Sequence, residues 1–290
     1  MTRPVSRFAP SPTGLLHLGH AFSALTVWEA VRSEGGVFLL RMDDLDQGRC
    51  RAAYADAIAD DLRWLGLHWP EPVLFQSSRT AEHVAELDAL TAQGLAYPCF
   101  CTRAEIQAAA GAPQEGAEMG PPYPGTCRQR PRSLADGPHA LRLDMRAAID
   151  GLGGANAVRA LAFKEIGYGP RGEQGWIALD PKALIEEVGD VVLRRKDGAV
   201  AYHMAVVLDD AWQGITHVTR ANDLFPSTPL HRLLQALTRR PTPVYRHHRL
   251  IRDADGRRLA KRDGDRALAA LRSAGATPDH IRNAVMAHAT

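Results

Sequence analysis

Cysteine is scarce in this sequence of 290 residues, which contains four. Four cysteines in a chain of this length exclude a disulfide scaffold, so a reducing cytoplasm is the expected compartment. No apolar run approaches the roughly 20 residues that a membrane-spanning helix needs, so no membrane association is expected. The N-terminus reads Met-Thr-Arg-Pro before a β-rich segment, which is not the pattern of a signal peptide. The formal net charge is only +2, so any nucleic-acid partner has to be inferred from local basic patches.

The first hundred residues alternate between strand and helix patterns. Hydrophobic residues make up 45% of the chain and charged residues 23%, which is ordinary for a globular protein of about two domains. Residues 5–9 and 37–41 have the apolar character of buried parallel strands. Apolar spacing predicts helices that begin near Leu18, end at Gly66 and end near Gly94. This rhythm is typical of a doubly wound parallel α/β sheet.

The alternation stops at Pro98. Residues 111–125 are rich in glycine and proline and predict a loop, and residues 126–175 are basic and irregular, as in an inserted subdomain. Asp197-Gly198 between two apolar runs predicts a hairpin over residues 191–202. The later elements expected are an apolar run at 204–208, strands at 215–219 and 244–251, a helix at 228–237 and two short helices at 267–288. An α/β domain split by an insertion fits this order best.

The stretch from Arg7 to His20 carries the strongest local signal for chemistry. It reads Arg-Phe-Ala-Pro-Ser-Pro-Thr-Gly-Leu-Leu-His-Leu-Gly-His, so a strand runs into a Pro/Gly turn and His17 and His20 open a helix. A helix N-terminus attracts phosphate, and two imidazoles there add donors for a phosphate in its transition state. The alternative is that both histidines are helix caps or half-buried residues. A metal pair is disfavoured because no third ligand lies nearby.

Three cysteines form a second candidate site. Cys99 and Cys101 flank Phe100, and Cys127 follows later in the chain. Zinc takes four ligands in a tetrahedron, and Tyr123 is the one candidate for the fourth with a plausible spacing. Tyrosine is a rare ligand because its phenol must lose a proton with a pKa of about 10. Free thiols are the alternative, and the remaining cysteine, at position 50, is expected to be an ordinary thiol.

A basic segment lies near the C-terminus. Residues 257–264 read Arg-Arg-Leu-Ala-Lys-Arg-Asp-Gly and follow the last expected strand. A lysine there, Lys261, would neutralise a triphosphate or a leaving pyrophosphate if the segment acts as a lid. The alternative is a solvated basic loop.

Together these motifs resemble the class I aminoacyl-tRNA synthetases, in particular the glutamyl branch. His17-Leu-Gly-His20 resembles the first signature of that class, and Arg258-Leu-Ala-Lys-Arg262 resembles the second. Residues 7–14 have the form typical of glutamyl enzymes, and residues 41–46 resemble the Arg-x-Glu-Asp-x-Asp strand end of the family. Asp43 stands where the family mostly has glutamate, and Ala260 and Arg258 replace the serine and the first lysine of the second signature. The resemblance covers nearly the whole chain.

The short stretch after the second signature narrows the resemblance. A glutamyl-tRNA synthetase has a further helical domain that reads the anticodon, whereas this sequence stops soon after the signature. It therefore resembles the truncated paralogue family, the glutamyl-Q-tRNA(Asp) synthetases, which attach glutamate to queuosine in tRNA(Asp). Charging of tRNA(Glu) and a non-catalytic tRNA-binding relic are the alternatives. The expected domains are the two halves of a Rossmann-type catalytic domain at 1–98 and 190–264, a zinc-containing α+β insertion at 99–189 and short C-terminal helices at 265–290.

The resemblance also implies roles for individual residues. It implies an ATP site, with Mg²⁺ bridging the phosphates, at His17, Gly19, His20 and Lys261. The catalytic residues would be His17, His20 and Lys261. A pocket for L-glutamate would be formed by Arg7, Ser11, Asp43, Tyr202 and Arg220. Without the family match, Tyr202 would be a core residue of a strand and Arg220 a residue of a surface turn.

Further implications concern the metal and the partners. One structural Zn²⁺ per chain would be held by Cys99, Cys101, Tyr123 and Cys127, because a Cys-x-Cys…Tyr-x₃-Cys site is a feature of the family. The expected partners are ATP, L-glutamate and tRNA(Asp) that carries queuosine, and the chain is expected to be a monomer. The basic residues expected to contact RNA phosphates are Arg128, Arg130, Arg132, Arg194, Arg195 and Lys196. A scattered, solvated basic face is the alternative for this last group.

Overall fold

The chain is described by a computed structural model that covers residues 3–102, 104–106, 122–130, 137–251 and 267–287. Lys261 and Arg132 lie outside these ranges. None of the helices in the described ranges combines the length and apolar character needed to cross a bilayer.

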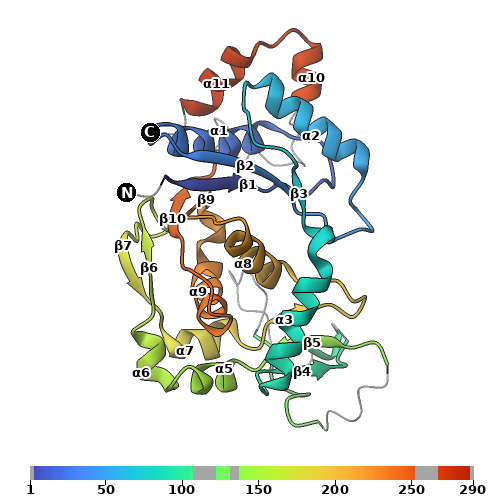
Figure 1. The fold of residues 1–290 in the computed structure, drawn as a ribbon, viewed down its shortest axis with the longest axis vertical. Coiled ribbons are helices and arrows are strands. Elements are labelled where there is room, and N and C mark those ends of the chain that lie inside the picture. The colour runs from blue at the N-terminus through green and yellow to red at the C-terminus, as the bar shows by residue number, and fades with distance from the viewer. Residues whose placement is uncertain (1–2, 103, 107–121, 131–136, 252–266, 288–290) are drawn as a thin grey trace.

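The N-terminal part of the chain forms a parallel sheet of three strands. The strand order is β1-β2-β3, with β1 at Val5–Phe8, β2 at Val37–Met42 and β3 at Leu74–Phe75. The connecting helices are α1 (Leu18–Arg32) and α2 (Ala52–Trp64), and α1 begins where the sequence predicts. Figure 1 shows both helices, with the C-terminal helices α10 (Leu268–Ser273) and α11 (Pro278–Met286), above this sheet.

The second half of the chain contributes a four-stranded sheet in the order β7-β6-β10-β9. Its strands are β6 (Ala162–Glu165), β7 (Gly175–Ala178), β9 (His217–Ala221) and β10 (Val244–His248). Strand β10 runs parallel to both β9 and β6, whereas β7 is antiparallel to β6. This sheet meets the first one where the Thr216 amide donates to Val5 O at 3.0 Å, just before β9. The expected doubly wound sheet is therefore present as two adjoining blocks of parallel strands, with one antiparallel edge.

A third sheet is small and antiparallel. It consists of β4 (Ala96–Cys99), β5 (Ala140–Leu143) and β8 (Val192–Arg194) in that order. Helix α3 (Thr80–Ala92) leads into β4, and Figure 1 shows this sheet at the lower end of the molecule. The short helices α5 (Met145–Gly151), α6 (Gly154–Arg159) and α7 (Pro181–Ala183) lie between β5 and β8 in sequence. The expectation of irregular chain over residues 126–175 was wrong for 140–165, where short strands and helices form.

Two helices of the second half pack beside the parallel strands. Helix α8 spans Tyr202–Trp212 and helix α9 spans Thr228–Leu237, the latter as the sequence predicts. The hairpin prediction for residues 191–202 was correct only in part. Arg194 and Val200 form an antiparallel bridge, but Tyr202 begins α8 instead of ending a strand. Val200-Ala201-Tyr202 looks strand-like in sequence. Ala201 does have an extended backbone, but it is the N-cap of α8, and the helix begins at the next residue.

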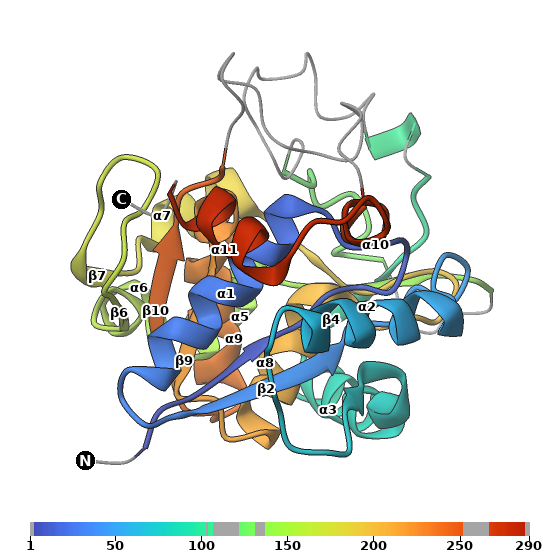
Figure 2. The ribbon, with the colours of Figure 1, turned by 90° about the horizontal axis from the view of Figure 1, so that it is seen from above.

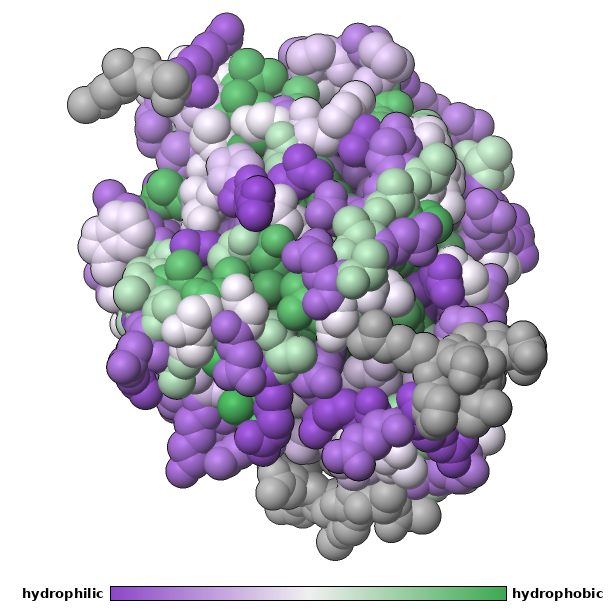
Figure 3. Space-filling model, turned by 60° about the horizontal axis from the view of Figure 1, so that its bottom comes forward, coloured by the Kyte–Doolittle hydropathy of each residue, from purple (hydrophilic) through white to green (hydrophobic). Residues whose placement is uncertain are grey.

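The hydrophobic core has two main clusters. One contains α1, α2 and the C-terminal helices, and Figure 2 shows α11 lying alongside α1. The other lies around α8, α9 and the strands that surround them. On the face drawn in Figure 3 hydrophilic residues surround a patch of hydrophobic ones near the centre. Apolar surface of this kind is ordinary, because polar atoms cannot cover a whole protein exterior.

The carboxyl ends of the parallel strands bring polar side chains together. Arg7 lies in β1, Arg41 in β2, Arg220 in β9 and His247 in β10, each in the second half of its strand. In open α/β sheets, ligands bind beyond this edge, where the strand order switches direction. The fold therefore predicts a ligand-binding site in the region between β1 and β9.

Candidate active site

His17 and His20 cap the N-terminus of α1. His17 is the N-cap residue, and its Nδ1 accepts the Gly19 amide at 3.1 Å. In return, Nδ1 of His20 accepts the His17 amide at 3.3 Å, which makes a capping box built from two imidazoles. Because Nδ1 of each neutral ring is an acceptor, the ring proton lies on Nε2. The helix-cap interpretation is thus confirmed, and Nε2 is the donor that each ring would present to a phosphate.

A hollow of about 370 Å³ lies next to this helix start. It is lined by Thr13, Gly14, Leu15, Leu16, His17, Tyr54 and Ala267. The Leu268 amide donates to Leu16 O at 2.8 Å, so the chain that follows the second signature returns to the first one. The hollow lies where an ATP site is expected.

A buried charged cluster joins β1, β2 and α8. The Arg7 guanidinium donates from Nε and Nη2 to the two carboxylate oxygens of Asp210, at 2.8 and 3.1 Å. Arg41 is fully buried and binds Asp210 Oδ1 at 2.7 Å and Asp43 Oδ1 at 2.8 Å. Burial alone would raise the pKa of Asp210, but the two guanidiniums hold it below its ordinary value. For Asp43, burial prevails over the attraction of Arg41 and raises the pKa.

Arg220 is buried in a cluster of different chemistry. Its Nε donates to His247 Nε2 at 3.0 Å, its Nη1 contacts His231 Nδ1 at 3.2 Å and its Nη2 donates to Thr228 Oγ1 at 2.8 Å. These three acceptors are uncharged, because burial first and the guanidinium second lower the pKa of His231 well below its usual value, and burial also lowers the pKa of His247. Within the described residues, no carboxylate is hydrogen-bonded to Arg220. A buried cation with neutral acceptors is suited to an anionic ligand.

The remaining residues expected in the glutamate pocket lie beside these clusters. The Tyr202 ring is 5.9 Å from the His231 ring, centroid to centroid, which places it near Arg220. Ser11 is exposed and follows Pro10, whose carbonyl accepts the Asp43 amide at 3.0 Å. The expectation that Arg220 would by itself be a surface turn residue was wrong, because it lies buried in β9. Tyr202, which would by itself be a core strand residue, is 38% exposed on a helix.

The three cysteines meet at the end of β4. Their sulfur atoms all lie within 4.8 Å of one another, and Cys101 and Cys127 are 3.5 Å apart. Tetrahedral zinc with Zn–S bonds of about 2.3 Å separates two ligand sulfurs by about 3.8 Å, so this spacing fits the metal. Tyr123 Oη lies 3.3 Å from Cys101 Sγ and accepts the Cys127 amide at 3.0 Å. Burial raises the pKa of Tyr123, so its phenol would ionise there only against a bound cation.

Several of the basic residues expected to contact RNA already have partners. Arg128 binds the Asp190 carboxylate at 2.6 Å, and Lys196 donates to Phe100 O at 2.6 Å. Arg195 pairs with the carboxylate of Asp197. The two arginines are paired with carboxylates and so have less charge to offer to phosphates, whereas Lys196, whose partner is a neutral carbonyl, keeps its charge.

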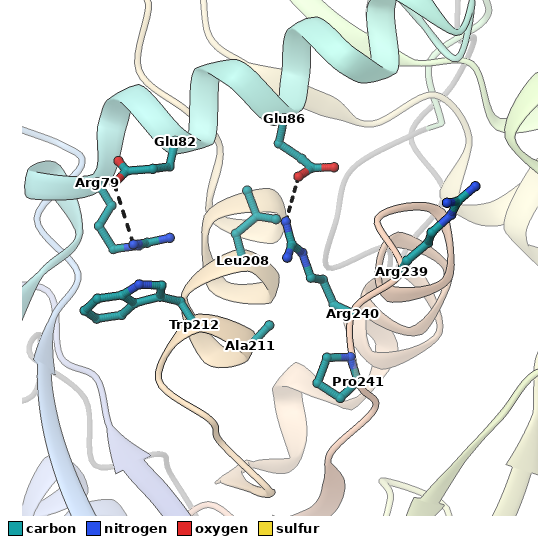
Figure 4. A pocket seen from close by; sticks show the side chains of 9 residues that line it. All are labelled: Arg79, Glu82, Glu86, Leu208, Ala211, Trp212, Arg239, Arg240 and Pro241. Atoms are coloured by element: carbon teal, nitrogen blue, oxygen red, sulfur yellow. Dashed lines mark hydrogen bonds and ion pairs between the residues drawn. The ribbon is translucent and has the colours of Figure 1, made fainter.

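A second hollow of about 190 Å³ lies between α3, α8 and the end of α9 (Figure 4). There the Arg79 guanidinium stacks 4.3 Å from the Trp212 ring centroid and donates to Asp209 Oδ1 at 2.9 Å. Arg240 Nη2 donates to Glu86 Oε2 at 2.8 Å. Of the three arginines that line this hollow, Arg79 and Arg240 are each paired with a carboxylate.

The comparisons with known proteins agree with one another. The family described as tRNA synthetases class I (E and Q), catalytic domain, matches residues 5–288. A glutamyl-Q tRNA(Asp) synthetase from Rhodobacter capsulatus is 47% identical over 289 residues, covering 97% of this chain and 99% of that protein. The chain belongs to the glutamyl-Q tRNA(Asp) synthetase family. A glutamyl-Q tRNA(Asp) synthetase from Symbiobacterium thermophilum is 39% identical and covers 95% of this chain and 83% of that protein.

Solved structures place this member of the glutamyl-Q tRNA(Asp) synthetases in a larger fold group. A glutamate tRNA ligase from Elizabethkingia meningosepticum, solved in complex with its amino acid, matches with a TM-score of 0.69 and 27% identity over 91% of this chain. This chain spans about half of that ligase, 53% of its length. Methionyl-tRNA synthetase from Mycobacterium tuberculosis matches with a TM-score of 0.57 at 12% identity, which shows a shared fold alone.

In this glutamyl-Q tRNA(Asp) synthetase family member, sequence reasoning gave no role in the site to several residues that build it. They are Arg41, Glu165, Asp210, His231 and His247. One signal was present, because Asp209-Asp210 directly follows the apolar run Met204–Leu208 and so places carboxylates in buried helix. Buried carboxylates require cations or hydrogen-bond donors, so they point to a charged cluster.

Proposed function

We propose that this protein uses ATP to activate L-glutamate and transfers the glutamate to the queuosine base of tRNA(Asp). The observation that supports this function best is the buried Arg220 guanidinium, which has neutral acceptors and lies on the same strand edge as Arg7 and Asp43. Two cations and one carboxylate match the two carboxylates and one ammonium of glutamate. The kinship with glutamyl-Q tRNA(Asp) synthetases supports the acceptor.

In the first step, an oxygen of the glutamate α-carboxylate attacks the α-phosphorus of ATP in line with the leaving group. A carboxyl–phosphate bond forms, the bond to the β-phosphate oxygen breaks, and pyrophosphate leaves with the electron pair. No protein nucleophile is needed, so positioning and electrostatic stabilisation supply the rate. His17 and His20 would donate from Nε2 to the phosphates, and Lys261 would neutralise the β,γ end. Mg²⁺ would screen the charge of the phosphate oxygens when it is bound with ATP.

In the pocket, Arg220 would bind one glutamate carboxylate end-on and Arg7 the other. Asp210 already binds Nε and Nη2 of Arg7, so among the described contacts Nη1 is the group left for substrate. Asp43 would hold the ammonium, with Ser11 and Tyr202 closing the pocket. In the second step, a hydroxyl of the queuosine cyclopentenediol attacks the glutamyl carbonyl. An ester bond forms, the bond from the carbonyl carbon to the phosphate oxygen breaks, AMP leaves with the electron pair, and the hydroxyl proton is released to solvent.

Queuosine dependence tests this function directly. Radiolabelled glutamate should enter tRNA(Asp) that carries queuosine and should not enter the same tRNA with guanosine at that position. Labelling of tRNA(Glu) should stay at background. Incorporation into tRNA(Asp) regardless of queuosine, or into tRNA(Glu), would show that the acceptor is wrong, and absence of glutamate-dependent ATP–pyrophosphate exchange would show that activation itself is wrong.

The cysteine cluster supports a structural zinc site in this function. We propose that Cys99, Cys101, Tyr123 and Cys127 hold one Zn²⁺ per chain, which would tie the end of β4 to the segment around residue 127.

The division of the chain into catalytic halves at 1–98 and 190–264, an insertion at 99–189 and C-terminal helices at 265–290 is also a proposal. Strand β6 lies within 99–189 but pairs with β10, so this insertion would contribute to the parallel sheet as well.

Measuring the zinc content of cysteine variants distinguishes the proposed ligand cysteines from Cys50. The purified protein should contain about one zinc per chain, and Cys127→Ser should lose most of it because three ligands hold zinc far more weakly than four. Cys50→Ser is the matched control, since Cys50 lies outside the cluster, and it should keep its zinc. Zinc content that is unchanged in Cys127→Ser, measured by atomic emission, would exclude Cys127 as a ligand.

A further inference from the structure

Glu165 is a buried carboxylate with an unusual set of partners. It lies at the end of β6 and is 1% exposed. Its Oε1 accepts the amides of Gly167 and His247 at 2.7 and 2.9 Å, and its Oε2 is 2.5 Å from His247 Nδ1. Its contacts with the described residues are thus two backbone amides and one imidazole. The carboxylate is held rigidly and faces a single side chain.

The position of the His247 proton follows from these contacts. A carboxylate only accepts, so Nδ1 of His247 carries the proton that points at Glu165. Arg220 can only donate, so its contact with Nε2 requires a neutral His247 ring, in agreement with burial, which is the largest effect on this group and lowers the pKa of His247. A neutral ring protonated on Nδ1 has a bare Nε2, and this atom accepts Nε–H of Arg220 at 3.0 Å. Glu165 thereby sets the tautomer that Arg220 needs.

The hydrogen bonds of Arg220 leave a defined pair of donors. A guanidinium has five N–H groups, of which one goes to His247, one to Thr228 and one to His231. Among the contacts of the described residues, one N–H on each of the two terminal nitrogens then remains. Two such groups side by side form the fork that binds a carboxylate with both oxygens. The orientation of this fork is fixed by the acceptors behind it, and His247 is the one that holds Nε.

We propose that Glu165 and His247 are positioning residues, which orient the Arg220 fork toward a carboxylate of the amino-acid substrate. The inference rests on the proposed function, in which Arg220 binds glutamate. Neither residue contacts the substrate: Glu165 acts on His247, and His247 acts on Arg220. The arrangement favours a carboxylate over an amide, because a fork with only donors meets two acceptors in a carboxylate but one acceptor and one donor in an amide.

The backbone around Glu165 is shaped for this contact. A Cβ added at Gly167 would lie 2.2 Å from the carbonyl oxygen of His247 and 2.7 Å from its amide nitrogen. Real Cβ atoms do not approach backbone so closely, so only glycine lets this segment run against β10. This approach places the Gly167 amide on Glu165 Oε1 and turns Oε2 toward the imidazole.

Glu165→Gln reverses the polarity of the contact with little change in shape. The amide oxygen can keep the two backbone donors, which leaves the NH₂ group facing His247 Nδ1. The ring must then carry its proton on Nε2, where it confronts Nε–H of Arg220. The expected result in ATP–pyrophosphate exchange is a KM for glutamate raised about tenfold, with the KM for ATP unchanged, because only the amino-acid fork is disturbed. Glu187→Gln, at an exposed position, is the matched control and should match the unsubstituted protein.

A spectroscopic readout keeps the inference testable if the variant folds poorly. In the unsubstituted protein labelled with ¹⁵N-histidine, His247 should show the neutral Nδ1–H tautomer, with its signals assigned by their loss in His247→Gln. A neutral Nε2–H ring or a charged ring would overturn the proposal, as would a Glu165→Gln variant with an unchanged KM for glutamate. If the unsubstituted protein does not activate glutamate, the proposed function fails, and the tautomer still decides whether Glu165 orients His247.

Discussion

Replacing Arg220 by alanine is expected to raise the KM for glutamate in ATP–pyrophosphate exchange by at least about 30-fold, since truncating one partner of a buried, hydrogen-bonded charge pair costs roughly 2–5 kcal/mol. The effect should be large because Arg220 is 6% exposed and its hydrogen-bond acceptors are uncharged. The guanidinium therefore offers an incoming carboxylate a charge that none of its hydrogen-bond partners among the described residues compensates. The KM for ATP should change little.

Lysine at this position should fail almost as badly as alanine. Its ammonium keeps the charge, but it has three donors and no planar fork, so it cannot satisfy Thr228, His231 and His247 and still bind both oxygens of a carboxylate. Arg159→Ala is the control, because Arg159 is exposed and its hydrogen bond among the described residues is to Asn156, within α6. An unchanged KM for glutamate in Arg220→Ala would move the carboxylate site elsewhere, with Arg7 as the next candidate.

Replacing Asp210 by asparagine is expected to lower the free energy of unfolding by about 3–5 kcal/mol, the usual cost of removing one partner from a buried ion pair. Asp210 is the carboxylate shared by two buried guanidiniums, those of Arg7 and Arg41. Asparagine keeps the shape but removes the charge, and its NH₂ group must face a guanidinium donor. Two cations would then lie side by side with Asp43 as the remaining carboxylate.

The loss should depend on pH in a definite direction. The folded-state pKa of Asp210 lies below its ordinary value of 3.8, so the stability that its charge supplies is fully present above about pH 4. That stability disappears as the pH falls through the folded pKa, and the two proteins should converge there. Urea denaturation followed by circular dichroism measures both effects. Asp88→Asn, at an exposed position of α3, is the control, and equal midpoints for Asp210→Asn and the unsubstituted protein at pH 7 would contradict the expectation.

Sequence periodicity predicted the elements whose signals are local. Helices α1 and α9 begin where apolar spacing and capping residues place them. The errors fall where tertiary context decides, as at Tyr202, whose strand-like neighbours lead into a helix. The short elements between residues 140 and 165 have too few turns or strand residues to show a period, so they read as irregular chain.

The candidate site could be predicted only as separate pieces. Motif resemblance supplied Arg7 and Arg220, but the partners that orient them are distant in sequence, as with Arg7 and Asp210, which are 203 positions apart. No local pattern encodes such a pair. His231 and His247, the histidines around Arg220, were missed for the same reason. Each is a single residue on its own element, and they come together around Arg220 only in the folded chain.

The capping box at the start of α1 has a consequence for how the sequence can change. Serine, threonine, aspartate and asparagine are the residues that cap helices best, and histidine is not among them. Position 17 nevertheless holds a histidine as the N-cap, with His20 returning the hydrogen bond. A sequence selected only for thermal stability would be drawn to replace His17 by one of the better caps, and it would discard the imidazole in doing so. If His17 binds phosphate as proposed, the helix start is a compromise between stability and activity, in which the fold keeps a weaker cap.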